Sequence, residues 1–248
     1  MEQGAGKYSS LSAVIPAFNE AARIEKAINE TSAYLSRNFG EFEIIVVDDG
    51  SLDNTVELVR KISGNSGRIR LIQNVLNQGK GLSVKRGVLV SRFDYVLFMD
   101  ADLSTPVDEL GRVMAAFSEG YGAVIGSRRM GGSQIEVYQP LLRRVSGALF
   151  HQLRKLLLLR DISDTQCGFK CFTREAAGKI FSAQKIKGFT FDVEILLLAK
   201  KFGYNIKEVP VKWIDNPKSK LFFFRHFGNI LADLAKITIN NLFNRYSK

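Results

Sequence analysis

The sequence predicts an α/β protein built on a doubly wound, mostly parallel sheet. Short apolar runs alternate with segments that carry apolar residues at helical spacing, which is the pattern of repeated βα units. The apolar runs are continuous, as is typical of strands buried on both faces of a parallel sheet. We expect such strands at residues 11–16, 42–47, 69–72, 95–99 and 123–126.

Helices are predicted between these strands. The first opens at Asn19–Glu20, the second takes Asp53 as its N-cap, and the fourth begins with Pro106, a residue favoured at the first helical position. Past residue 129 the alternation is less regular. There we expect helices at 141–160, 174–181 and 191–202, and strands at 169–172 and 209–213.

The composition narrows the class of protein. Of 248 residues, 46% are hydrophobic and 24% charged, which indicates a globular chain. The formal net charge of +10 points to an anionic partner such as nucleic acid, acidic lipid or a phosphorylated substrate. Cys167 and Cys171 have no histidine nearby in sequence, so reduced structural thiols of a cytosolic protein are expected. Neither a secretion signal nor a membrane-spanning run of ~20 apolar residues is apparent.

The most informative stretch is FDYVLFMDADLSTP, residues 93–106. Asp100 and Asp102 come directly after its buried strand, and residues i and i+2 of an extended chain project to the same side. A divalent cation relieves the repulsion between two such carboxylates, and hard oxygen ligands suit Mg²⁺ or Mn²⁺. A solvated turn is the alternative for this stretch taken alone.

Other strands of the predicted sheet also end in polar residues. Asn19 and Glu20 follow the first strand, and Asp48 and Asp49 end the second. Arg128 follows the fifth strand. Ligands of doubly wound sheets bind outside the carboxyl ends of the strands, so these groups are expected to share one site with the two later aspartates.

Three other nucleotide-related classes do not fit. Receiver domains carry their acidic pair after the first strand, whereas here it follows the second. The first turn is PAFNE, which lacks the G-x-G-x-x-G of dehydrogenases, and residues 79–81 lack the GK[ST] of a P-loop. A nucleic-acid binder is the alternative from another class, but the basic residues are spread along the chain without a recognition helix. We therefore expect no nucleic-acid partner.

Several ordered motifs resemble those of the family 2 glycosyltransferases, which have the GT-A fold. They are VIPAFNE (14–20), VVDDGSLDNT (46–55), NQGKG (77–81), DADLSTP (100–106) and GSR (126–128). DTQCGFKCFTREAA (164–177), FDVE (191–194) and SKL (219–221) are similar to the branch that uses dolichyl phosphate, closest to its glucosyltransferases and then to its mannose synthases. The resemblance covers residues 11–221.

The resemblance implies roles for individual residues. Those that would bind the nucleotide sugar are Pro16, Ala17, Phe18, Glu20, Asp48, Asp49, Lys80 and Asp100. Asp100 and Asp102 would hold Mg²⁺ or Mn²⁺, and the catalytic set would be Asp102, Arg128 and Asp192. The acceptor phosphate would be bound by Arg128, Arg143, Arg144 and Lys220.

The expected reaction is inverting transfer of a hexose, with UDP-glucose as the favoured donor, onto a polyprenyl or dolichyl phosphate. An ionised phosphate needs cations to position it and no strong general base. GDP-mannose is the alternative donor. A saccharide is the alternative acceptor, and its hydroxyl would need a base such as Asp192 or Glu194. For Asp192 a sugar contact and a bracing role both remain open, whereas bracing is preferred for Glu194.

The chain is expected to form one domain over 1–248. Its nucleotide-sugar half would span 11–130, its acceptor half 131–215 and an amphipathic helical tail 216–248. The tail, with Phe222, Phe223, Phe224, Phe227 and Leu231, either embeds an apolar face in the cytoplasmic surface of a membrane or packs on the domain, as at a dimer interface.

Overall fold

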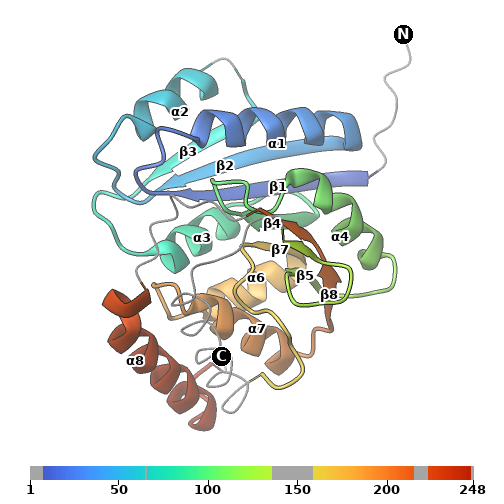
Figure 1. Ribbon diagram of the computed structural model, residues 1–248, viewed down its shortest axis with the longest axis vertical. Helices are drawn as coiled ribbons and strands as arrows, with labels where there is room; N and C mark the ends of the chain where they lie inside the picture. Colours follow the sequence, from blue (N-terminus) through green and yellow to red (C-terminus); the bar gives the residue numbers. More distant parts are fainter. Residues whose placement is uncertain (1–7, 65, 136–158, 215–222, 247–248) are drawn as a thin grey trace.

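The computed structural model is organised around one seven-stranded sheet (Figure 1). It describes residues 8–64, 66–135, 159–214 and 223–246. The strands are β1 (Tyr8–Ala17), β2 (Phe39–Asp48), β3 (Ile69–Gln73), β4 (Tyr95–Met99), β5 (Ala123–Ser127), β7 (Phe169–Thr173) and β8 (Ile206–Pro210). A separate pair is formed by β6 (Gln134–Ile135) and β9 (Lys212–Trp213).

The strand order is β3-β2-β1-β4-β7-β5-β8, and every neighbouring pair is parallel except those that involve β7. The predicted mostly parallel, doubly wound sheet is therefore confirmed. Both predicted halves of the chain contribute strands to it. The single strand predicted at 209–213 is wrong, because β8 ends at Pro210 and β9 leaves for the smaller pair. Pro210 is the last residue of β8 in register with β5, opposite Ser127, and Lys212–Trp213 pairs with β6 instead.

Helices cover both faces of the sheet (Figure 1). They are α1 (Ile24–Asn38), α2 (Thr55–Ser63), α3 (Lys80–Leu89), α4 (Leu110–Phe117), α6 (Arg174–Ala183), α7 (Phe191–Lys201) and α8 (Phe223–Leu242), with a 3-10 turn η1 (Val107–Glu109) before α4. The helix predicted at 141–160 lies outside the described residues, apart from Leu159 and Arg160, which are not helical.

Three helix starts differ from prediction. Pro106 is the N-cap of the 3-10 turn η1 and is not itself helical, and α4 begins only at Leu110. Asn19–Glu20 forms a turn in which Asn19 has φ +54°, and α1 begins only at Ile24. The N-cap of α2 is Asn54 rather than Asp53. The Asp53 carboxylate instead accepts the backbone N–H groups of Thr55 and Ala21. That second bond ties the loop after β2 to the loop after β1.

The hydrophobic core has two layers, one on each face of the sheet. One layer packs α1, α2 and α4 against residues such as Leu11, Ile15 and Leu97, and the other packs α3, α6, α7 and α8 against Val14, Phe98 and neighbours. Helix α3 packs closely against β1, because a Cβ on Gly87 would lie 2.4 Å from Val14 Cγ1. This packing holds the N-terminus of α3 at the carboxyl edge of the sheet.

Helix α8 has two apolar stripes. Ile230, Leu234 and Ile237 are buried in the core layer, whereas Leu231, Ile239 and Leu242 are exposed. Within the described residues, none of the helices combines the length and apolar character needed to cross a bilayer. The helical tail therefore packs on the domain, as one of the two alternatives predicted, and still presents a second apolar stripe to solvent.

Candidate active site

A cavity of about 390 Å³ opens at the carboxyl ends of β1, β2 and β4, beside the start of α3. Seven of the eight residues predicted to bind the nucleotide sugar line it, together with Asp102. Those seven are Pro16, Ala17, Phe18, Glu20, Asp49, Lys80 and Asp100. Asp49 and Asp102 thus open into the same cavity, although they lie 53 positions apart in sequence. The predicted convergence of strand ends on one site is observed.

Asp100 is fixed by the strand beside it. Its backbone N–H donates to the carbonyl of Gly168 at 3.1 Å, just before β7. A Cβ on Gly168 would lie 2.0 Å from Asp100 Oδ2, so only glycine leaves room for this carboxylate. Asp102 accepts the backbone N–H of Ser104 at 2.9 Å, which holds its carboxylate in the turn after β4.

Lys80 forms the closest charged contact to these acids. It is the first residue of α3, and its Nζ lies 2.6 Å from Asp100 Oδ1. Burial lowers the pKa of the Lys80 ammonium, but the carboxylates of Asp100, Asp192 and Asp102 outweigh this and raise the pKa above its ordinary value. Lys80 is therefore a cation at neutral pH.

The two aspartates fit a small divalent cation whose remaining coordination positions are filled by water and substrate phosphates. No group of three or more His, Cys, Asp or Glu side chains that could hold a metal occurs among the described residues. Mg²⁺ commonly binds through one or two carboxylates and fills its octahedral shell with water and substrate phosphates. Asp100 and Asp102, side by side on an open cavity, supply that number of carboxylates.

Asp49 sits at the inner wall of the cavity and organises the loop that follows β3. Its Oδ1 accepts from the side chain of Asn74 at 2.6 Å and from the backbone N–H of Gln78 at 3.0 Å. Its Oδ2 accepts the backbone N–H of Gly79 at 2.8 Å. The Asn74 amide is oriented in turn by Arg86, which donates to its oxygen, and it also donates to Ser83.

Asp48 is the one predicted nucleotide residue that does not line the cavity. Its carboxylate is buried and accepts the backbone N–H groups of Gly50 and Ser51 at 3.2 Å. These bonds shape the turn after β2, in which Gly50 has φ +76° and a Cβ would clash with the backbone of Leu76. Asp48 therefore supports the cavity indirectly, by fixing the backbone of the turn after β2.

Arg128 does not line the cavity and is paired with Asp164. Its Nε and Nη2 donate to the two oxygens of that buried carboxylate at 2.7 and 2.9 Å, and its guanidinium lies over the ring of Trp213. Burial raises the pKa of Asp164, but the Arg128 charge and hydrogen bonds dominate and leave it well below its usual range. The two side chains therefore form a charged pair whose net charge is close to zero.

Asp192 lies behind the cavity in an ion pair that the sequence did not predict. Lys170 Nζ is 2.6 Å from Asp192 Oδ1, and both side chains are buried. Burial, the largest influence, raises the pKa of Asp192, although the Lys170 and Lys80 charges act in the opposite direction. Glu194 accepts the backbone N–H groups of Lys185 and Ile186 and the hydroxyl of Tyr246, as expected of a bracing residue.

Several residues of the site escaped prediction. The cavity is also lined by Arg23, Asn77, Gly79, Ser83, Ala101 and Phe189. Arg23 pairs with Glu20 three residues earlier, a spacing that the sequence displays. Lys170 could have been noticed as a lone charge inside an apolar strand. Nothing in the sequence links Arg128 to Asp164. The predicted acceptor residues Arg143, Arg144 and Lys220 lie outside the described residues.

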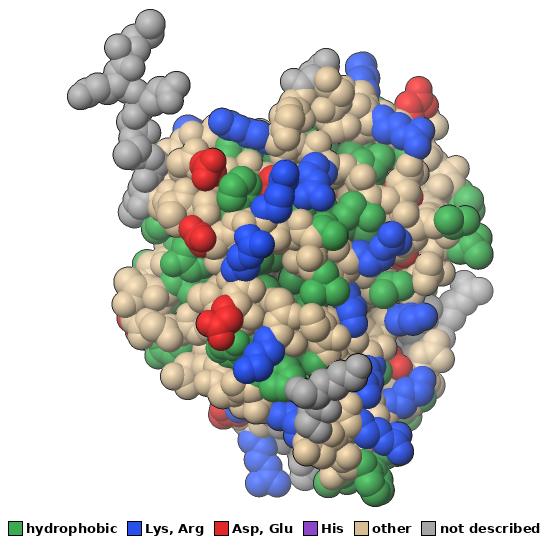
Figure 2. Space-filling model, turned by 180° about the vertical axis from the view of Figure 1, so that it is seen from behind, with side chains coloured by type: hydrophobic (Ala, Val, Ile, Leu, Met, Phe, Trp, Pro, Cys, Tyr) green, Lys and Arg blue, Asp and Glu red, His purple; other side chains and the backbone are tan. Residues whose placement is uncertain are grey.

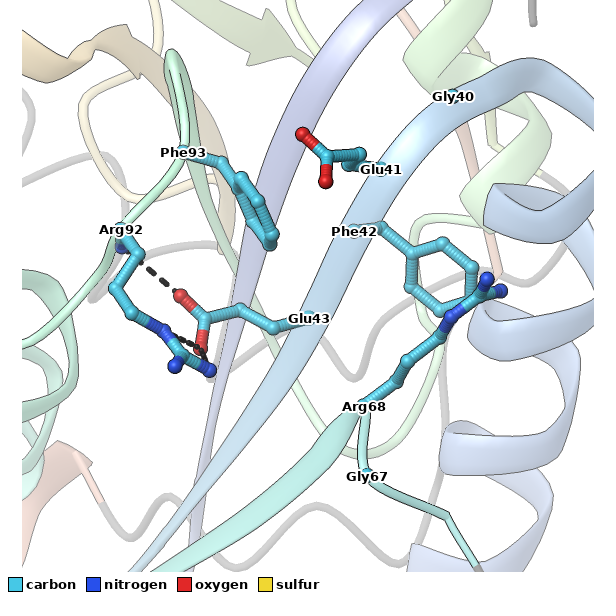
Figure 3. Close-up of a pocket in the computed structure, with 8 residues that line it drawn as sticks. All are labelled: Gly40, Glu41, Phe42, Glu43, Gly67, Arg68, Arg92 and Phe93. Carbon is cyan, nitrogen blue, oxygen red and sulfur yellow. Dashed lines mark hydrogen bonds and ion pairs between the residues drawn. The ribbon is translucent and has the colours of Figure 1, made fainter.

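A second hollow, of about 300 Å³, lies at the amino end of β2, away from the candidate site (Figure 3). Its buried carboxylate, Glu43, is fully paired. Glu43 is buried and accepts from Ser12, Arg70 and Arg92. Figure 3 shows the contact with Arg92 and the guanidinium of Arg68 over the ring of Phe42. This hollow therefore marks a structural ion-pair cluster.

Comparisons with known proteins agree with this geometry. The chain is 37% identical over 244 residues to a dolichyl-phosphate beta-glucosyltransferase of Dictyostelium discoideum, covering 94% of this chain and 75% of that protein. A dolichyl-phosphate beta-glucosyltransferase of Trichomonas vaginalis is 38% identical over 218 residues, covering 84% of this chain and 65% of the relative.

Solved structures confirm the predicted GT-A fold. Glucosyl-3-phosphoglycerate synthase from Mycobacterium tuberculosis, in complex with UDP, superposes with a TM-score of 0.67 at 19% identity, covering 92% of this chain and 80% of that one. The family model described as Glycosyl transferase family 2 matches residues 12–181, which include every strand end that lines the cavity. The chain belongs to glycosyl transferase family 2.

Proposed function

We propose that this glycosyltransferase moves glucose from UDP-glucose to a polyprenyl phosphate of the dolichyl type, with inversion at the anomeric carbon and with a divalent metal. The observation that carries the proposal is the shared cavity, in which Asp49, Lys80, Asp100 and Asp102 face one volume. The names of the relatives, dolichyl-phosphate beta-glucosyltransferases, support glucose as the sugar and a lipid phosphate as the acceptor.

Hydrogen-bond accounting at Asp49 favours uracil as the base. A carboxylate offers roughly four acceptor positions, and three N–H groups already use the oxygens of Asp49. One position is left for a ligand. The pairing edge of uracil presents one N–H, whereas that of guanine presents an N–H and an amino group side by side. The site therefore suits UDP better than GDP, which argues against GDP-mannose.

Asp100 and Asp102 would hold Mg²⁺ or Mn²⁺. Related folds that were crystallised with Mn²⁺ or Mg²⁺ and UDP support this choice. The bound ion would supply positive charge to the diphosphate as the glycosidic bond breaks. The protein itself would also contribute positive charge through the Lys80 ammonium, which lies beside Asp100. That ammonium would stabilise the negative charge that develops on the leaving diphosphate.

In the proposed transfer, an ionised oxygen of the acceptor phosphate attacks the anomeric carbon from the face opposite the diphosphate. The new bond joins that oxygen to the sugar, the bond to the β-phosphate breaks, and UDP leaves with the electron pair. Because no proton has to be removed, cations are sufficient to orient the acceptor. Arg128 does not line the cavity, but it keeps three of its five N–H donors after pairing with Asp164, and we propose it as a cation for the acceptor phosphate.

A saccharide acceptor is the weaker alternative. Its hydroxyl would need a general base within hydrogen-bond reach. Neither predicted base lines the cavity: Asp192 is paired with Lys170, and Glu194 is fully buried with its oxygens occupied by N–H and O–H donors. These contacts favour an acceptor that arrives already ionised.

A lipid acceptor requires the cavity to work against a membrane surface. Basic residues attract anionic lipid, and apolar side chains on an amphipathic helix can enter the headgroup layer. The exposed stripe of α8 suits that role, and Figure 2 shows Lys and Arg side chains spread over the rear face of the molecule. We propose peripheral binding to the cytoplasmic face, with α8 as one contact.

The test uses purified protein with radiolabelled UDP-glucose or GDP-mannose, polyprenyl phosphate in detergent, and Mn²⁺, Mg²⁺ or EDTA. Label from UDP-glucose alone is expected to become extractable into organic solvent, in a metal-dependent manner, and to be released by mild acid as a glycosyl phosphate is. Extractable label from GDP-mannose alone would contradict the donor. Transfer only to a water-soluble saccharide would contradict the acceptor.

A further inference from the structure

We propose that Lys80 is a movable counter-ion that makes binding of the divalent metal and binding of the donor diphosphate depend on each other. The inference rests on the proposed function and adds a mechanism of assembly to its site. The Lys80 ammonium contacts Asp100 Oδ1 at 2.6 Å. The side chains of Lys80 and Asp100 are 19% and 35% exposed, so water and ions reach the pair from the cavity.

The contact makes Lys80 a competitor of the metal. A divalent cation bound to Asp100 would share this carboxylate with the Lys80 ammonium. The metal and the ammonium are both positive, and two positive charges bound to one carboxylate repel each other strongly in a partly buried site. Metal binding therefore requires the ammonium to withdraw.

Only the side chain of Lys80 is free to move. The backbone at the start of α3 is clamped, since the Leu82 N–H donates to the carbonyls of Gly79 and Lys187. A Cβ on Gly79 would lie 2.5 Å from the Lys187 carbonyl oxygen, so the backbone here packs closely against the segment before α7. The lysine stem has four carbons with free rotation and a head that donates three hydrogen bonds.

The donor diphosphate offers the displaced ammonium a new partner. A charged ammonium that has lost Asp100 gains most from phosphate oxygens in the same cavity. The metal also gains phosphate ligands, which two carboxylates alone do not supply.

The consequence is reciprocal coupling. Without nucleotide, Lys80 opposes the metal; with nucleotide, Lys80 and the metal bind the same diphosphate and no longer compete. UDP should then tighten metal binding by the same factor as the metal tightens UDP binding, as linkage requires. Free metal would remain weakly bound, so the site would fill when metal and donor arrive together.

The test is a titration of the full chain with Mn²⁺, in which free Mn²⁺ is measured by its electron paramagnetic resonance signal. It is done with and without UDP and corrected for the Mn²⁺–UDP complex in solution. Wild-type protein should bind Mn²⁺ about tenfold more tightly when UDP is present. Lys80→Met should bind Mn²⁺ alone about tenfold more tightly than wild type and gain less from UDP. Lys80→Arg, which keeps the charge, should behave more like wild type.

Lys201→Met is the matched control, since it removes the same charge from an exposed site at the far end of α7. It should leave both Mn²⁺ affinities unchanged. An affinity of Lys80→Met for Mn²⁺ alone that equals or falls below that of wild type would overturn the inference while leaving the donor site standing. Wild-type protein that binds neither Mn²⁺ nor UDP would instead contradict the proposed function itself.

Discussion

The carboxylate of Asp100 occupies the space that any side chain on Gly168 would need, since a Cβ there would lie 2.0 Å from Asp100 Oδ2. The Gly168 carbonyl also accepts the backbone N–H of Asp100 at 3.1 Å. The end of β4 and the start of β7, which are antiparallel neighbours in the sheet, thus set the position of one acid between them.

Gly168→Ala is therefore expected to displace Asp100 and to abolish detectable transfer. The overpacking should also lower the free energy of unfolding by about 1–3 kcal/mol. Transfer would be measured with labelled donor, and stability by urea denaturation. Gly178→Ala is the control, because nothing lies within 4 Å of a Cβ at that helical position. Full activity of Gly168→Ala would mean that the observed position of Asp100 is not required.

Asp102→Ala should abolish transfer and leave the fold intact. The residue sits in a turn after β4, where its one described hydrogen bond accepts the N–H of Ser104, so little stability depends on it. Loss of charge stabilisation at the leaving group should lower kcat by at least about 10²–10³-fold. Circular dichroism checks the fold and single-turnover kinetics the rate. Near-normal turnover would remove the metal hypothesis.

The Lys170–Asp192 pair should behave as a buried ion pair. Lys170→Met leaves the Asp192 carboxylate without its partner, and the free energy of unfolding should fall by about 3–5 kcal/mol. Lys170→Met combined with Asp192→Leu should recover much of that loss, because an apolar pair of similar volume needs no compensating charge. Urea denaturation of the single and double variants measures the difference. Additive losses would show that the two side chains do not interact.

Stability should depend on pH through Glu43. Burial raises the pKa of this carboxyl, but hydrogen bonds from Arg70, Arg92 and Ser12 outweigh it and lower the pKa below the ordinary value of 4.5. The folded state thus binds the proton less readily than the unfolded state. Glu43 therefore contributes stability that is fully present above about pH 4.5 and is lost as the pH falls through the lowered pKa.

The measurement is thermal unfolding of wild type and Glu43→Gln between pH 7 and pH 3. The melting temperature of wild type should exceed that of the variant at pH 7, and the gap should narrow below pH 4.5. A gap that stays constant over the whole range would contradict the charged state assigned to Glu43. The pKa of Asp164 is also lowered, so Asp164 also makes stability depend on pH. This contribution is the same in wild type and in Glu43→Gln, and it cancels in the difference between their melting temperatures.

The exposed end of α8 should contribute to membrane binding. Leu242→Glu with Phe243→Glu changes two side chains that are 75% and 70% exposed, so the fold should be little affected. Co-sedimentation with anionic liposomes should fall. Deleting the whole tail is a poorer test, because Ile230, Leu234 and Ile237 belong to the core. Leu89→Glu with Val90→Glu, at the end of α3 remote from Lys80, is the control. Equal loss in both variants would count against α8.

The sequence by itself determined the βα alternation, the strand ends that form the cavity and eight of the residues that line it. Apolar runs and the polar residues that follow them can be read from short stretches of sequence. Parallel strands place their carboxyl ends at one edge of the sheet, whichever way the connecting helices run. This is why Glu20, Asp49, Lys80 and Asp102 were all found in one cavity, as predicted.

Only the tertiary structure decided which charges are available and which are already paired. Arg128 and Asp192 were predicted as catalytic from local motifs, yet each is held by a partner 36 or 22 positions away, Asp164 or Lys170. Ion pairs between distant segments depend on which strands become neighbours, and the insertion of antiparallel β7 between β4 and β5 created both the Lys170 contact and the Gly168 support for Asp100. No spacing in the sequence encodes that choice.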